Sequence, residues 1–350
     1  MSDVMKETGM VKKILVIDLA FIGDVILATP VMRALKAKYP SARLTMLTVP
    51  LTADAAIMDP YVDDVLVYDK RGRHRGIRGM FRIARQLKKQ HFDLSVCMNF
   101  AVRGAVVSWL AGIPHRLGYD AQHAGWFLTM VQSAQREGIK HETLNHQEVL
   151  RPLGVSEATD ALLVLEPPQA AMDSLAHKRE RLGIPESGYI VLCPFGSYAK
   201  KNLSLAAAAH LVHHWNQRQV VYLIGGPGES AELDKIAQMA GLPLTQVLAG
   251  TLALPELAVF LQQADCLVTV ETGPMHMAEA VNCPVVAVFG PTDPVVWGPR
   301  NERDVVLYKK QDCSPCWGKG ICTENTCMGA ISVMEILRAA DAVRKGAHEA

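Results

Sequence analysis

The chain shows one pattern twice: short apolar, β-branched runs alternate with helical segments. The first such unit is "KKILVIDLAFIGDVILATPVMRALKAKYP", in which the run from Ile14 to Ile17 leads into a loop and a helix that closes at Pro40. The stretch "YIVLCPFGSYAKKNLSLAAAAHLVHHW", which begins at Tyr189, has the same plan. This alternation is typical of parallel sheets covered by helices on both faces. The sequence therefore predicts an α/β protein with two doubly wound parallel sheets.

Further strand-like runs follow each of these two units. They are "RLTMLTV", "DVLVY" and "DLSVCMNF" in the first half, and "QVVYLIGG", "CLVTVE" and "PVVAVFG" in the second. The interval "LEPPQAAMDSLAHKRERLGIPESG" bears prolines and charges but no strand signal, which favours a connection with one helix. We predict domains over 11–170 and 186–330 that face a central cleft, and a final helical segment, 331–350, that packs back on the first domain.

Composition argues against nucleic-acid binding, secretion and membrane spanning. The chain has 36 basic and 35 acidic residues, so its net charge of +1 gives no global signal for nucleic acid. The first ten residues lack the apolar stretch of a secretory signal, and no apolar run approaches the ~20 residues that span a bilayer. We therefore expect a cytoplasmic protein without a transmembrane segment, for which peripheral membrane contact stays open.

Ligands of open α/β sheets bind at the carboxyl ends of the strands, so the loops there are the candidate sites. In the first loop, Gly23 allows a tight turn and Asp24 stands at the helix entrance. Asp24 is either a helix-capping aspartate or a general base.

Two loops of the second half offer phosphate or ribose contacts. Gly196 and Ser197 can expose an amide and a hydroxyl, and Lys201 follows four residues after Ser197. This arrangement is either a phosphate cradle or a pair of solvated lysines. Glu229, just beyond a strand end, is either a ribose ligand or a favourable acidic residue in the first turn of a helix.

The stretch "VETGPMHMAEAVNCPVVAVFG" places a helix start directly after a strand. Thr272 or Gly273 caps this helix, and Pro274 suits its first position. The unpaired amides of Gly273, Met275 and His276 form an anion site at the positive end of the helix, with Glu271 beside it. The alternative is an ordinary helix start whose Met and His face the core.

A basic tract, "KRGRHRGIRGMFRIARQLKKQH", contains no acidic residue between Lys70 and His91. Its second half fits a solvated helix face. Its glycine-rich front is a poor helix former that can bind acceptor phosphates, acceptor carboxylates or anionic lipid headgroups. The candidate acceptor-binding residues in this front are Arg71, Arg73, Arg75 and Arg78.

Eight cysteines fall into two sets. Four lie singly in apolar segments and are expected to be reduced core residues. The other four, in "CSPCWGKGICTENTC", have spacings that can hold tetrahedral zinc, although packing cysteines or a labile disulfide are favoured over a metal. They are Cys313, Cys316, Cys322 and Cys327.

Taken together, four stretches resemble glycosyltransferase family nine, the heptosyltransferases of the lipopolysaccharide inner core. They are "KILVIDLAFIGDVILATPVMRALK", "PFGSYAKKNLSL", "YLIGGPGESAEL" and "LVTVETGPMHMAEAVNCPVVAVFGPTDPVVWGP". The resemblance runs from about residue 12 to the C-terminal helix and is densest between Asp265 and Pro299. It implies a GT-B fold, in which the first domain binds the acceptor and the second binds the nucleotide sugar.

The resemblance also implies roles for the candidate residues. The expected reaction transfers a heptose from ADP-heptose to a Kdo or heptose on lipid A with inversion, and it requires no metal or other cofactor. Asp24 matches the family's catalytic base, Lys201 the lysine near the donor phosphates with Ser197 close by, and Glu229 the carboxylate at the adenosine ribose. The residues that match the donor loop are Thr272, Gly273 and His276.

The sequence departs from the family pattern at two positions. Glu271 stands where the family usually has an aspartate, which leaves the donor sugar open, and Leu203 replaces a usual tryptophan. A transferase with another nucleotide-sugar donor and a nucleotide-sugar epimerase of the same fold remain alternatives. A nucleic-acid binder built from the basic tract and a zinc knuckle is disfavoured by the low net charge and by the lack of a stacking motif.

Overall fold

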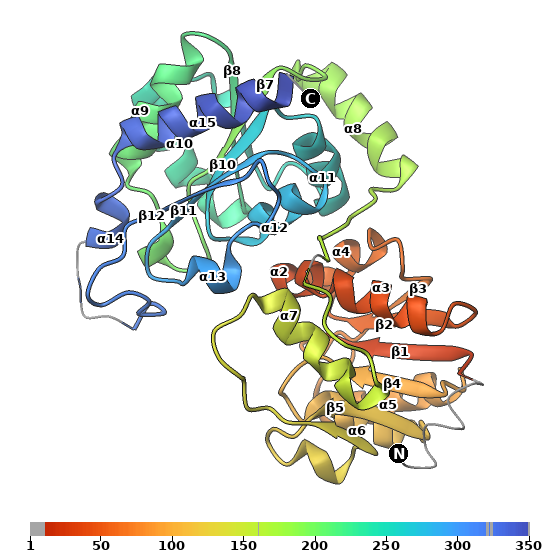
Figure 1. Ribbon diagram of the computed structural model, residues 1–350. Coiled ribbons are helices and arrows are strands. Elements are labelled where there is room, and N and C mark those ends of the chain that lie inside the picture. Colours follow the sequence, from red (N-terminus) through yellow and green to blue (C-terminus); the bar gives the residue numbers. More distant parts are fainter. Residues whose placement is uncertain (1–10, 160, 320–321, 323–324, 349–350) are drawn as a thin grey trace. The chain divides into compact units, whose positions relative to one another are not determined.

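The structure is a computed structural model that describes residues 11–159, 161–319, 322 and 325–348. The chain divides between Val164 and Leu165 into two compact units, here called the N-terminal and C-terminal units (Figure 1). Each unit holds one six-stranded sheet, and every strand pair in both sheets is parallel. The predicted pair of doubly wound sheets is therefore confirmed.

The sheet of the N-terminal unit has the strand order β3-β2-β1-β4-β5-β6. Its central strand β1 is apolar and buried, because neighbouring strands pair with it on both edges: Ile17 lies opposite Leu47 of β2 and Cys97 of β4. The strands are β1 (Lys13–Ile17), β2 (Arg43–Thr48), β3 (Asp64–Val67), β4 (Leu94–Cys97), β5 (His115–Tyr119) and β6 (Met130–Gln132).

Helices cover both faces of this sheet. On one face, α5 and α6 supply Ile83, Leu87 and Val107 to a core that also contains Leu15 and Tyr68. On the other face, α7 contacts both α2 and α3. These helices are α2 (Ile22–Leu27), α3 (Thr29–Lys38), α4 (Ala53–Ile57), α5 (Gly76–Lys88), α6 (Arg103–Leu110) and α7 (Glu142–Gln147).

The C-terminal unit repeats the same topology. Its sheet has the order β12-β11-β10-β7-β8-β9, which is the order of the first sheet when each is numbered from its own first strand. This is the strand order of dinucleotide-binding domains. The strands are β7 (Tyr189–Cys193), β8 (Val220–Gly225), β9 (Val247–Ala249), β10 (Cys266–Val270), β11 (Val285–Phe289) and β12 (Val305–Tyr308).

The C-terminal helix completes the core of the C-terminal sheet. This helix, α15 (Val333–His348), contacts β10, β11 and β12 and buries Ile336, Leu337 and Ala340 in the core that α9 and α10 share. Its apolar stripe thus faces the sheet of its own unit, and the expected packing of this segment on the first domain stays a prediction. Within the described residues, no helix combines the length and hydrophobicity that crossing a bilayer requires.

The connecting interval also belongs to the C-terminal unit. Its helix α8 (Gln169–Leu182) packs against α11, where Ser174 and Lys178 both donate hydrogen bonds of 2.6 Å to the carboxylate of Glu256. The remaining helices of the unit are α9 (Leu205–Asn216), α10 (Ser230–Ala240), α11 (Leu254–Gln262), α12 (Gly273–Ala280), α13 (Pro294–Trp297) and α14 (Thr326–Gly329).

Three aromatic rings fix α11 to the C-terminal sheet, and they give a test of this packing. Phe260 stacks on Tyr189 with ring centroids 4.7 Å apart and meets the edge of Tyr222 at 5.4 Å. The Tyr189 hydroxyl also donates a hydrogen bond of 2.7 Å to the Phe260 carbonyl. Phe260→Ala should cost about 3–5 kcal/mol through lost burial and a residual cavity.

Hydrogen exchange of the β7 amides measures this loss locally. Met239→Ala is the matched control, because Met239 is exposed, and it should change the exchange free energy by less than about 0.5 kcal/mol. Equal protection in the Phe260 variant and the wild type would contradict the packing described here.

Candidate functional site

In each sheet the strand order reverses between two neighbouring strands, and their carboxyl ends form the natural ligand position. These switch points lie between β1 and β4 in the N-terminal unit and between β7 and β10 in the C-terminal unit. The loops that the sequence singled out around Asp24, Lys201 and Glu271 follow β1, β7 and β10. The topology therefore places three of the four predicted loops at switch points.

A polar pair, of which Asp18 is buried and Asn99 partly buried, joins the two strand ends of the N-terminal unit. Asn99, just after β4, donates a hydrogen bond of 3.0 Å to the carboxylate of Asp18, just after β1. The amide of Leu19 donates in return to the Asn99 side chain at 2.7 Å. Asp18 is fully buried, and the sequence analysis did not single out either residue.

Asp24 lies one turn further on, at the third position of α2, with Gly23 in the same turn. Its Oδ2 accepts a hydrogen bond of 3.0 Å from the amide of Phe21, the residue that precedes the helix. Burial raises the pKa of the Asp24 carboxyl, the negative charge of Asp18 raises it further, and His146 and the Phe21 amide oppose the shift. Asp24 thus both caps its helix and presents a carboxylate of increased basicity.

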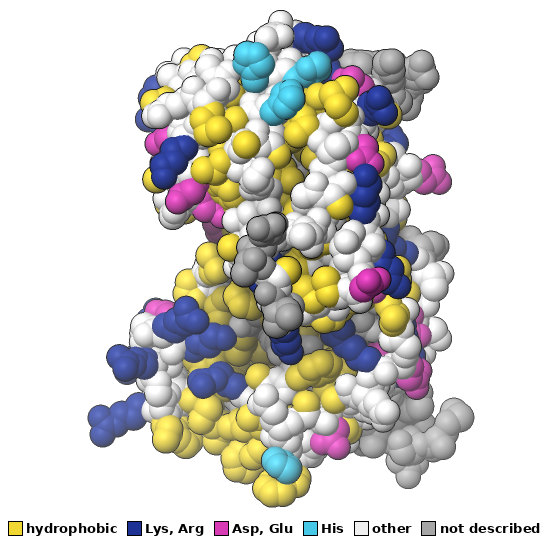
Figure 2. Space-filling view, turned by 90° about the vertical axis from the view of Figure 1, so that its left-hand side faces the viewer, with side chains coloured by type: hydrophobic (Ala, Val, Ile, Leu, Met, Phe, Trp, Pro, Cys, Tyr) yellow, Lys and Arg dark blue, Asp and Glu magenta, His cyan; other side chains and the backbone are white. Residues whose placement is uncertain are grey.

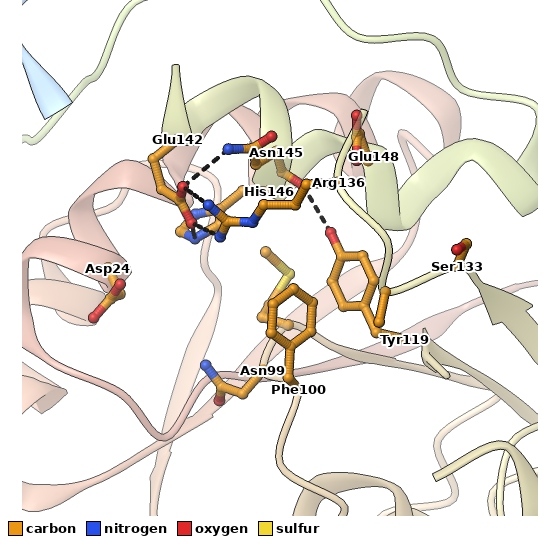
Figure 3. A pocket seen from close by; sticks show the side chains of 12 residues that line it. Asp24, Asn99, Phe100, Tyr119, Ser133, Arg136, Glu142, Asn145, His146 and Glu148 are labelled. Atoms are coloured by element: carbon orange, nitrogen blue, oxygen red, sulfur yellow. Dashed lines mark hydrogen bonds and ion pairs between the residues drawn. The ribbon is translucent and has the colours of Figure 1, made fainter. Parts of the chain in front are cut away.

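Asp24 lines a pocket whose far wall is built by α7 and the segment before it (Figure 3). At its centre, Arg136 donates two hydrogen bonds to Glu142, at 2.9 and 2.6 Å. Glu142 also accepts from Asn145 at 3.0 Å and lies 3.5 Å from Nε2 of His146. The lining residues are Asp24, Met98, Asn99, Phe100, Tyr119, Ser133, Ala134, Arg136, Glu142, Asn145, His146 and Glu148.

This network was missed at the sequence level. Arg136 lies in a segment without periodic pattern, and only the fold brings it to α7. The one readable signal is the spacing of Glu142 and His146, which are four residues apart and so share a helix face. The pocket brings together a carboxylate, an arginine, a histidine and amide side chains, a set that can bind and orient a polyhydroxylated or acidic ligand.

The basic tract divides into residues near the strand ends and residues away from them. Lys70 donates a hydrogen bond of 2.9 Å to the Leu19 carbonyl. Burial lowers the pKa of Lys70, as do the charges of Arg103 and Arg71. Arg71 lines a second, largely apolar pocket with Phe21 and Leu51.

The other predicted acceptor residues are not at these pockets. Arg73, Arg75 and Arg78 are exposed, and none of them lines the pockets around Asp24, Lys70 or Arg71. The glycine-rich front of the tract was predicted to be a poor helix former. This is confirmed only as far as Arg75, because α5 begins at Gly76.

In the C-terminal unit, the loop after β7 meets the end of β10. The Lys201 ammonium forms an ion pair with the Glu271 carboxylate, and both side chains are nearly buried, since the residues are 7% and 8% exposed. The same ammonium lies 3.4 Å from the Ser197 hydroxyl and 4.7 Å from the centre of the Tyr198 ring. Three groups from two loops therefore surround one cation at the switch point.

Gly196 leaves the space that the Lys201 side chain occupies at this point. A β-carbon there would lie 3.0 Å from Cβ of Lys201, so a larger residue would push the lysine away. The Gly196 amide donates to the Asn202 side chain at 2.9 Å, which fixes the loop. Gly196 therefore has a positioning role in the structure.

The helix start after β10 matches the predicted pattern. Thr272 caps α12, and Gly273 and Pro274 occupy its first two positions. The side chains of Met275 and His276 are buried, as the core-facing alternative predicted, so these two residues offer backbone groups to a ligand.

Glu229, after β8, accepts a hydrogen bond of 2.7 Å from the Gly226 amide. Its carboxylate thereby closes the tight turn Gly226–Glu229 at the strand end. This bond is the one expected of an acidic residue in a first turn, and the second carboxylate oxygen accepts no hydrogen bond among those found in the described part of the chain.

The clustered cysteines are unpaired, and Cys327 is buried whereas Cys313 is exposed. No group of three or more His, Cys, Asp or Glu side chains suitable for a metal occurs among the residues that the structure describes. The cysteine segment instead packs on the loop of Lys201, where Asn325 donates a hydrogen bond of 3.2 Å to the Ala199 carbonyl.

Comparison with known proteins identifies the family. The family model of glycosyltransferase family 9 (heptosyltransferase) matches residues 80–326. Lipopolysaccharide heptosyltransferase 3 of Escherichia coli is 26% identical over 298 residues, which are 82% of this chain and 86% of that protein.

Two solved structures share the fold over nearly the whole chain. A glycosyl transferase family 9 protein from Veillonella parvula has a TM-score of 0.84 at 23% identity, covering 96% of this chain and 97% of that one. ADP-heptose lps heptosyltransferase II of E. coli has a TM-score of 0.80 at 20% identity, covering 97% and 100%. The family match, which covers well over half of the chain, and the shared fold show that this protein belongs to glycosyltransferase family 9.

Proposed function

We propose that this glycosyltransferase moves a heptose from ADP-heptose to the inner core of lipopolysaccharide, with Asp24 as general base. The observation that carries the proposal is the partly buried Asp24 carboxylate of raised pKa, which lines a polar pocket at the first switch point. The names of the E. coli relatives support the donor and the acceptor. On this proposal the N-terminal unit binds the acceptor and the C-terminal unit binds the nucleotide sugar.

In the proposed mechanism, one displacement inverts the anomeric carbon. The Asp24 carboxylate takes the proton of the acceptor hydroxyl as its oxygen attacks the anomeric carbon of the heptose. The bond to ADP breaks at the same time, and ADP leaves with the bonding electron pair. A carboxylate whose pKa is raised is a stronger base in its ionised form.

The departing diphosphate needs a cationic environment. Lys201 supplies a fixed positive charge, and the amides at the start of α12 point from the positive end of a helix. We propose that these groups neutralise the leaving group without a metal or another cofactor. Glu229 is the proposed ribose contact, and the reaction takes place at the cytoplasmic face of the inner membrane.

Asp24→Asn tests the assignment of the base. The amide keeps an oxygen that can accept from the Phe21 amide but cannot take a proton, so turnover should fall by roughly 10²–10⁴-fold. ADP affinity should stay at the wild-type value. Asp54→Asn is the matched control, since Asp54 is an exposed aspartate in the first turn of α4. Turnover within a few-fold of wild type in the Asp24 variant would exclude this residue as the base.

The pH dependence of kcat/KM tests the electrostatics around Asp24. Because the base must be ionised, kcat/KM should rise with pH through a midpoint above the ordinary aspartate value of 3.8. His146 lowers the Asp24 pKa, so His146→Gln should move this acid limb to higher pH. His123→Gln is the control, as His123 is an exposed histidine of the same unit. A limb that stays in place, or moves to lower pH, would contradict the proposed coupling.

ADP affinity tests the role of Lys201. Lys201→Met should weaken ADP binding by about 10–100-fold, the loss of one charged hydrogen bond. Glu271→Gln should leave binding unchanged or tighten it, because it removes the carboxylate that pairs with Lys201. Lys235→Met, at an exposed lysine of α10, is the control.

The paired variants separate contact with ADP from support of the fold. Lys201→Met leaves Glu271 as a buried charge without its partner, whereas Lys201→Met/Glu271→Gln does not. Weak ADP binding in both, at equal thermal stability of the double variant and the wild type, would support direct contact. Wild-type affinity in the double variant would show that Lys201 does not bind the diphosphate.

A further inference from the structure

Helix α5 of the N-terminal unit exposes large apolar side chains on a charged surface. Ile83 and Leu87 of this helix are buried in the core, whereas Ile77 is 72% exposed and Phe81 is 55% exposed. Ile77, Phe81 and Arg85 follow one another at intervals of four residues, so they form one strip along the helix. The fold leaves this apolar pair on the outside, although the helix has a complete buried face.

The surroundings of the apolar pair are uniformly basic. Seven exposed basic residues lie on α5 or next to its ends: Arg73, Arg75, Arg78, Arg82, Arg85, Lys88 and Lys89. No acidic residue occurs between Asp69 and Asp93, and none of the ion pairs among the described residues involves these seven. Lysine and arginine side chains gather in this way on one side of the N-terminal unit in Figure 2.

The combination favours a lipid surface over other polyanions or another protein. Apolar side chains flanked by lysine and arginine are typical of helices that lie in the headgroup region of an anionic bilayer. A second copy of this chain would place seven like charges opposite each other, which is unfavourable. A single-stranded nucleic acid would be met by several aromatic side chains for base stacking, whereas only Phe81 of this pair is aromatic.

A pocket in the segment before α5 also favours a lipid surface as the ligand. The segment that leads from β3 into α5 contributes Asp69, Lys70 and Arg71 to a pocket whose other walls are apolar. These walls are Leu19, Ala20, Phe21, Val49, Pro50 and Leu51. Phe21 and Leu51 are themselves more than half exposed. Apolar and basic groups thus meet at the strand ends as well as on α5, which is the arrangement that an amphiphile at a bilayer surface would contact.

We infer that α5 docks the N-terminal unit on a bilayer rich in anionic lipid, with Ile77 and Phe81 inserted between headgroups and the basic residues on lipid phosphates. This inference does not depend on which sugar is transferred. The ligand of α5 is the bilayer surface itself, so this docking differs from binding of the acceptor sugar near Asp24.

Co-sedimentation of the full chain with vesicles tests the inference. Wild type should bind phosphatidylcholine vesicles that contain phosphatidylglycerol, bind pure phosphatidylcholine weakly, and dissociate at high salt. Ile77→Ser/Phe81→Ser and Arg85→Glu/Lys88→Glu should each reduce binding to the anionic vesicles by at least roughly tenfold. All four side chains are exposed, so the thermal midpoints of these variants should equal that of wild type.

Matched controls lie on the C-terminal unit. Met239→Ser/Leu244→Ser removes two equally exposed apolar side chains, and Arg181→Glu/Lys235→Glu reverses two exposed charges. Both control variants should bind as wild type does. Loss of binding in the controls as large as in the α5 variants would show an unspecific effect and overturn the inference.

Two further measurements separate the lipid surface from other ligands. With a delipidated, water-soluble acceptor, the α5 variants should keep wild-type turnover, since these residues are away from the pockets around Asp24 and Lys70. Retained vesicle binding in both α5 variants, together with lost binding to a soluble polyanion such as heparin, would overturn the proposal in favour of a nucleic-acid-like ligand.

Discussion

The structure depends on a topological constraint that acts twice. A doubly wound parallel sheet must send its connections to opposite faces at one point, and the carboxyl ends of the two strands there have no crossover above them. Backbone groups at such ends need polar partners, which in this protein come from the strand-end loops themselves. Asp18 and Asn99 serve β1 and β4, and Lys201 and Glu271 join the loops after β7 and β10. Polar chemistry is thus concentrated where the fold leaves room for a ligand.

The central strands could be predicted from sequence because burial on both faces leaves a continuous apolar run. The run Ile14–Ile17 and its counterpart after Tyr189 show this. Some peripheral strands lack that signal: β5, which lies next to the edge strand β6, reads "HRLGY", β6 is three residues long, and the edge strand β12 is only half-buried. The sheet that α15 covers could not be predicted from sequence for a related reason. An apolar stripe shows that a helix is buried on one side, but it does not specify which sheet covers it.

The residues of the candidate site also divide into those that the sequence predicts and those that it does not. Asp24, Lys201 and the start of α12 were predictable, because glycine, proline and capping residues beside a strand are local signals. The Arg136–Glu142–His146 network was not, since its members come from a segment without pattern and a short helix that only the tertiary fold brings to Asp24. This network contributes to the electrostatics of Asp24. Burial and Asp18 raise the Asp24 pKa, whereas His146 of the network lowers it.

The Lys201–Glu271 pair has a consequence for donor recognition. In the structure the carboxylate neutralises the lysine, so a diphosphate that binds Lys201 has to displace Glu271 from it. A nearly buried carboxylate without its cation needs new hydrogen-bond donors. On the proposed function, the hydroxyl groups of the sugar attached to that diphosphate would supply such donors. If the diphosphate is bound at Lys201, the sugar that satisfies Glu271 is therefore favoured over one that does not, and the longer glutamate side chain becomes a determinant of which donor is used.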